Sequence, residues 1–63
     1  MSRYEQLLTE NERIKIRDTH SLPDGYSGFY NDGIILIDKN LPETRKAEVL
    51  FEELAHHKLT YGN

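Results

Sequence analysis

The chain has 63 residues, a length that predicts one small domain, residues 1–63, with a modest core. It has no cysteine, which excludes a disulfide scaffold and a thiolate metal site. Its formal net charge is −3 at pH 7. Because the basic residues are scattered along the sequence, we expect no direct binding to DNA or RNA.

The first predicted element is a helix. Ser2 is followed three residues later by Glu5, which is the signature of a capping box. Apolar side chains then recur at helical spacing. The pattern predicts a helix that runs to about Glu12.

A strand and a loop follow. Residues 13–17 alternate strictly between charged and apolar, which places Ile14 and Ile16 on one face of a half-exposed strand. Residues 18–27 contain Pro23 and Gly25 and are predicted to form a loop.

The centre of the chain predicts a hairpin. The Asp32-Gly33 step lies between Tyr30 and the apolar run 34–37, and such a step is typical of a tight turn between two strands. We expect the run 34–37 to be covered on both faces. Tyr26 and Tyr30 either line a cleft or serve the core and the hairpin.

The same apolar run bears on the location of the protein. Residues 34–37 are the longest apolar run and are far too short to span a bilayer. The start of the chain lacks the basic and apolar segments of a secretory signal. We therefore expect a soluble cytoplasmic protein with no membrane partner.

The last predicted element is a helix that begins between Asn40 and Pro42 and continues to about Thr60. At about 100° per residue, one set of side chains forms the stripe that packs on the sheet: Ala47, Leu50, Phe51, Leu54 and Tyr61. A second set points to the opposite side, with Leu59 beside it: Val49, Glu52, Glu53 and His56. The predicted fold is therefore α+β, with an N-terminal helix, a small antiparallel sheet of about three strands and a C-terminal helix.

That C-terminal helix carries the most informative motif, residues 52–57, Glu-Glu-Leu-Ala-His-His. It reads as H-E-x-x-H with the first His replaced by Glu. Glu52 and His56 lie four residues apart on one helix face, the spacing of two metal ligands, and Glu53 is placed as a carboxylate base. On its own the motif is far more often a charged helix face with a Glu/His pair than a metal site.

Five segments of the chain form a recognisable series: residues 4–8, 25–30, 31–37, 41–46 and 49–57. In their order and spacing they resemble the N-terminal part of the ImmA/IrrE family of phage and mobile-element zinc endopeptidases. The motif helix is similar to the family's "LAEELGHH" segment.

The resemblance implies a zincin-like domain in which Glu52 and His56 are ligands of Zn²⁺ and Glu53 is the general base for the attacking water. A carboxylate ligand also suits manganese. The family's third ligand is an acidic residue on a later helix, and we expect residues 58–63 not to supply it. Zinc binding by these residues alone is then expected to be weak.

The chain has two other histidines, His57 and His20. If Glu53 and His57 were the ligand pair, Leu54 would stand in the position of the base, and leucine cannot accept a proton. Glu52 and His56 are therefore preferred as the ligand pair. His57 remains a second candidate ligand, but a half-buried helix histidine is the simpler interpretation. His20 lies in the polar loop and is assigned no function.

Three functions follow from the sequence. The first is a peptidase that acts on a helix-turn-helix repressor once its metal site is completed. The second is a truncated, non-catalytic module that binds a protein partner, or a second copy of itself, through the exposed face of the motif helix. The third is a folded domain with no activity of its own.

Overall fold

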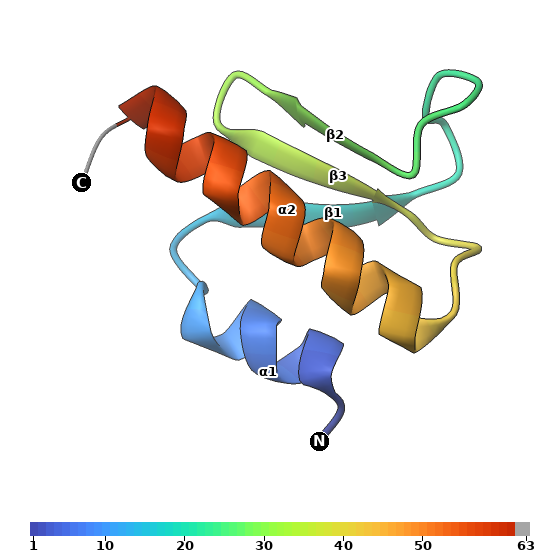
Figure 1. Ribbon diagram of the computed structural model, residues 1–63, viewed down its shortest axis with the longest axis horizontal. Coiled ribbons are helices and arrows are strands. Elements are labelled where there is room, and N and C mark those ends of the chain that lie inside the picture. The colour runs from blue at the N-terminus through green and yellow to red at the C-terminus, as the bar shows by residue number, and fades with distance from the viewer. Residues whose placement is uncertain (62–63) are drawn as a thin grey trace.

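The computed structural model describes the backbone of residues 1–61 and the side chains of residues 1–59. Figure 1 shows the second helix crossing one face of a small sheet, with the first helix alongside it. The α+β class and the element order are confirmed. The elements are α1 (Arg3–Glu10), β1 (Lys15–Thr19), β2 (Gly28–Asn31), β3 (Ile34–Asp38) and α2 (Glu43–Tyr61).

The sheet is mixed, with the strand order β1-β3-β2. β2 and β3 form the predicted antiparallel hairpin, but β1 pairs with β3 in parallel, with Lys15 opposite Ile34. The prediction of an antiparallel sheet was therefore wrong. The loop of residues 20–27 carries the chain past the position next to β1, which lets β3 insert between β1 and β2.

The turn of the hairpin has the geometry that its sequence predicts. Asp32 has φ 52° and Gly33 has φ 81°. Two consecutive left-handed residues form the tight turn whose twist matches that of the flanking strands.

The central strand β3 is covered by a helix on one face. Ile35 and Ile37 are fully buried beneath α2, whereas Ile34 and Leu36 on the other face are half-buried. The prediction that both faces are covered was wrong for the part of the chain that the structure describes.

The N-terminal elements differ from their predictions by about two residues. The capping box forms, because the Glu5 amide donates to Ser2 Oγ and the Ser2 amide donates to Glu5 Oε1. α1 ends at Glu10 rather than near residue 12, and β1 covers residues 15–19 rather than 13–17. Ile14 and Ile16 nevertheless both pack against the core.

α2 is rotated about its axis relative to the prediction. Ala47, Leu50 and Leu54 are buried as predicted. Val49, expected on the far side, is only 3% exposed, and Phe51, expected in the core, is 61% exposed. The predicted packing of Tyr61 concerns a side chain outside those described.

The rotation of α2 follows from a contact with Gly28 in β2. A Cβ atom at position 28 would overlap with Cγ1 of Val49 and would lie 3.3 Å from Cγ of Glu53. Because glycine has no side chain, the helix approaches β2 closely enough to bury Val49. The contact turns Val49 and Glu53 toward the strand.

A polar cluster joins α1, β1 and α2 one helical turn before Val49. The Tyr4 hydroxyl donates to Asp18 Oδ1, and Lys46 Nζ lies 3.0 Å from Asp18 Oδ2. Burial raises the pKa of Tyr4. Partial burial alone would raise the pKa of Asp18, but the hydrogen bonds from Tyr4 and Lys46 outweigh it and hold that pKa below its ordinary value.

We predict that Gly28→Ala lowers the free energy of unfolding by about 2 kcal/mol, because the new methyl group overlaps with Val49. Val49→Ala alone should cost a similar amount through the cavity it leaves. In the double variant the methyl group of Ala at position 28 occupies space that the shortened side chain at position 49 leaves. The loss in free energy of unfolding should therefore be at least about 1 kcal/mol smaller than the sum of the two single losses. Urea unfolding measures all three, and strict additivity would contradict the contact.

We also predict an acid-sensitive contribution from Asp18. Its pKa is lowered on folding, so its stabilisation is present above the unfolded pKa of about 4 and is lost as the pH falls through the folded value. Asp18→Asn should lower the free energy of unfolding by about 2 kcal/mol at pH 7. The variant should then lose less stability than the unchanged chain as the pH falls. Asp24→Asn in the exposed loop is the control, and an unchanged acid profile in Asp18→Asn would contradict the cluster.

Candidate functional site

Glu53 and His56 lie together on the side of α2 that faces β2. The Glu53 side chain is 12% exposed and the His56 side chain 61% exposed. His56 Nδ1 is 3.3 Å from Glu53 Oε1. Glu53 is therefore held between the helix and the strand, while His56 extends into solvent beside it.

These two side chains help to line a hollow of about 360 Å³ next to β2. The Tyr26 ring meets the Phe29 ring edge to face, with centroids 5.6 Å apart. Because β2 is at the edge of the sheet, the predicted base and one predicted ligand lie beside an open strand edge. The lining residues are Tyr26, Gly28, Phe29, Tyr30, Glu53 and His56. Both tyrosines thus line the hollow, and Tyr30 also packs against the core.

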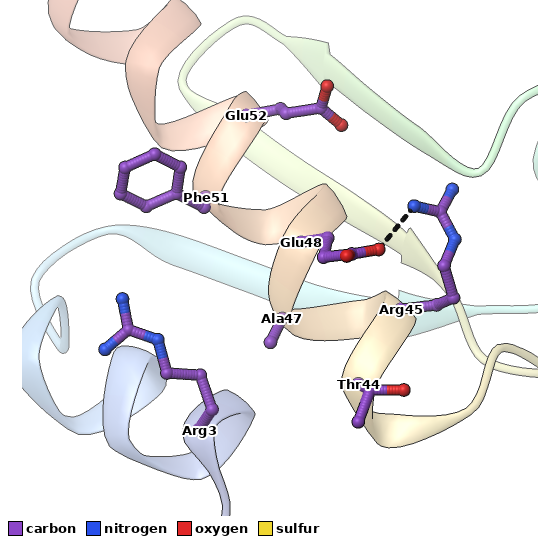
Figure 2. A pocket seen from close by; sticks show the side chains of 7 residues that line it. All are labelled: Arg3, Thr44, Arg45, Ala47, Glu48, Phe51 and Glu52. Carbon is purple, nitrogen blue, oxygen red and sulfur yellow. Dashed lines mark hydrogen bonds and ion pairs between the residues drawn. The ribbon is translucent and has the colours of Figure 1, made fainter.

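Glu52 faces solvent and helps to line a second hollow, of about 640 Å³, on the outer side of α2. Figure 2 shows Phe51 and Glu52 pointing to opposite sides of the helix. Arg45 and Glu48, which also line this hollow, form an ion pair at 2.7 Å. Glu52 and His56 therefore share the solvent side of α2, but they line different hollows.

His57 is half-buried and contacts β2. Its Nδ1 is 3.1 Å from the Tyr30 hydroxyl oxygen, and the two rings meet edge to face. The expected position of a half-buried helix histidine is observed. Tyr30 therefore occupies the Nδ1 position of His57.

The donors near His56 fit zinc in kind but not in number. Carboxylate and imidazole groups are both zinc ligands. A histidine that binds zinc through one ring nitrogen usually donates the N–H of the other to a carboxylate. His56 can do this, because Nδ1, when protonated, donates to Glu53. His56 would then present Nε2 to a metal. No group of three or more such side chains gathers within the described residues, whereas a catalytic zinc usually takes three protein ligands.

Sequence reasoning missed the partners that β2 supplies to α2. Gly28 and Tyr30 are two residues apart in a strand, so both point to the face that α2 covers. Gly28 admits Val49, and Tyr30 binds His57. The signal was the Gly-x-Tyr spacing, which has this meaning only once the strand is known to lie beneath the helix.

Comparisons with protein-family models, with curated proteins and with solved structures find no match. The resemblance to ImmA/IrrE proteins therefore rests on the sequence segments alone. Neither α1 nor α2, as far as the chain is described, is long and apolar enough to cross a lipid bilayer.

We predict that Tyr30→Phe lowers the free energy of unfolding by about 1 kcal/mol, because it removes the hydroxyl that binds half-buried His57. Tyr26→Phe is the matched control, since Tyr26 is 53% exposed, and it should change stability by less than about 0.5 kcal/mol. Urea unfolding of both variants tests this. Equal effects would contradict a structural role for the contact between Tyr30 and His57.

Proposed function

We propose that the chain forms the motif helix and edge strand of a zinc-dependent endopeptidase similar to ImmA/IrrE proteins. One observation supports this proposal: the side chains of Glu53 and His56 are within hydrogen-bond distance of each other and line a hollow beside β2. A general base and a metal ligand next to a strand edge are the parts that peptide hydrolysis needs first.

The strand edge defines how a substrate would bind. An extended peptide can add to an exposed sheet edge through main-chain hydrogen bonds. β3 is paired on both sides and cannot accept a further strand, whereas β2 lies at the edge next to Glu53. A peptide on β2 would therefore bring its backbone carbonyl groups near that carboxylate.

The residues of α2 then take separate roles. Glu52 and His56 would hold the zinc ion, with at least one further ligand from outside the described residues. When bound, zinc would polarise the scissile carbonyl group. Glu53 would take a proton from the attacking water and return it to the leaving amine. His57, bonded to Tyr30, would position the helix on the strand.

The substrate follows from the family resemblance. ImmA/IrrE proteins act on helix-turn-helix repressors, so we propose a repressor of a phage or mobile element as the target and the cytoplasm as the place of action. Recognition would be protein to protein, with no direct contact to nucleic acid. The net charge of −3 is consistent with this.

A second candidate function is binding without catalysis. Phe51 is 61% and Leu59 84% exposed on the outer face of α2, and exposed apolar side chains that gather on one face are typical of protein contacts. This surface is separate from the hollow that contains Glu53. A partner bound there would leave the proposed base unused.

We predict that Glu53→Gln abolishes cleavage of the repressor while zinc binding by calorimetry stays within about threefold, because Gln keeps the shape but cannot take a proton. His56→Ala should lose both zinc binding and cleavage. Glu48→Gln, an exposed carboxylate on the same helix, is the control. Relief of repression that survives Glu53→Gln but is lost in Leu59→Lys would favour the binding function instead.

A further inference from the structure

The side of the sheet away from α2 is a surface of its own, which we call the open face. Side chains alternate along a strand, and Ile35 and Ile37 of β3 are buried beneath α2. Ile34 and Leu36 therefore point to the open face. In the described chain α2 covers the opposite face and α1 packs beside α2, so neither helix covers this one (Figure 1).

Two rows of side chains cross the open face, each with an aliphatic residue of β3 at its centre and a basic residue of β1 at one end. Lys15 and Arg17 are exposed, and within the described residues neither forms an ion pair. Phe29 belongs to the edge strand β2, so it borders both the open face and the hollow near Glu53. One row is Arg17, Leu36 and Phe29, and the other is Lys15, Ile34 and Asn31.

We propose that the open face docks on the open face of a second copy of this chain, so that the two sheets form a sandwich with the β3 strands at its centre. This inference goes beyond the proposed function. It needs neither zinc nor Glu53, because Glu53 lies on the other side of the sheet, between α2 and β2.

The distribution of charge on the open face favours a second copy as the partner. A two-fold axis parallel to β3 places β1 of each copy over β2 of the other. Arg17 then lies over the ring of Phe29 of the second copy, and a guanidinium over an aromatic ring is attractive. Lys15 lies over Asn31 of the second copy, next to the carboxylate of Asp32 in the turn. Each contact occurs twice, so the face is complementary to itself.

The apolar centre fits the same axis. Leu36 packs over Leu36 of the second copy, and Ile34 packs over Ile34. Packed sheets lie about 10 Å apart with their strands within about 30° of each other, so these side chains can interdigitate. A two-fold axis across the strands would instead place β1 over β1 and set basic side chains against one another, which disfavours that arrangement.

One contact opposes the pair. Asp38 ends β3 and points to the open face two residues after Leu36, so the axis brings the Asp38 carboxylates of the two copies together. Asp38 Oδ1 accepts a hydrogen bond from the Asn40 amide, and an asparagine at position 38 would keep this acceptor. Removal of the charge should therefore strengthen the pair and leave the local fold intact.

The small area of the open face sets the strength of the pair. Three strands of at most five residues span only about 10 Å by about 17 Å. A standard interface takes about 800 Å² of surface from each partner, and this face offers less. We therefore expect a monomer in dilute solution and a dimer at high protein concentration.

Sedimentation equilibrium of the full chain in EDTA tests the proposal. Between about 10 µM and about 1 mM we expect the average mass to rise from monomer toward dimer, and zinc should not change the dissociation constant. Arg17→Glu alters an exposed side chain and removes both contacts with Phe29, so it should raise the dissociation constant about tenfold. Asp38→Asn should lower the dissociation constant about threefold. A loss of folding cannot mimic this tighter binding.

Matched controls separate the contact from the general effect of charge. Arg3→Glu makes the same change of charge on α1, and Asp24→Asn removes the same charge from the exposed loop. Phe51→Lys changes the exposed outer face of α2. All three variants should dimerise as the unchanged chain does, and circular dichroism should show that each is folded.

Two results would overturn the proposal. One is a chain that stays monomeric at about 1 mM. The other is a dimer that Arg17→Glu and Asp38→Asn leave unchanged, and its loss in Phe51→Lys would place the contact on α2 instead. Neither result bears on zinc binding or cleavage, so the proposed function would stand or fall separately.

Discussion

The close approach of Val49 to Gly28 is the constraint on which the candidate site depends. The missing side chain at position 28 lets α2 settle onto β2. That contact sets the rotation of the helix, so Glu53 turns toward the strand and His56 lies beside it. A larger residue at position 28 would push the helix away and separate the carboxylate from the strand edge.

A second contact holds α2 one helical turn before Val49. Lys46 reaches Asp18 on β1, and Asp18 in turn accepts a hydrogen bond from Tyr4 on α1. α2 is thus fixed by apolar contact with β2 at Val49 and, three residues earlier, by a polar cluster with β1 and α1. Held at both contacts, the helix presents a defined outer face, on which Phe51 and Leu59 are exposed.

Local sequence patterns predicted the elements well, because capping, alternation and turn chemistry act over a few residues. The capping box at Ser2 and the turn at Asp32 and Gly33 formed as expected. The parallel pairing of β1 and the rotation of α2 were not predicted, because both depend on which strands become neighbours. The sequence showed the spacing of Glu53 and His56, but their position beside β2 could be seen only in the fold.

The most direct test of the account is the nitrogen spectrum of the three histidine side chains during a zinc titration by NMR. We expect zinc to shift the Nε2 resonance of His56 while Nδ1 keeps its proton toward Glu53. His57, bound to Tyr30, and His20, in the exposed loop, should not respond. A response of His57 or His20 in place of His56 would contradict the site, and the absence of any response would contradict zinc binding by this chain.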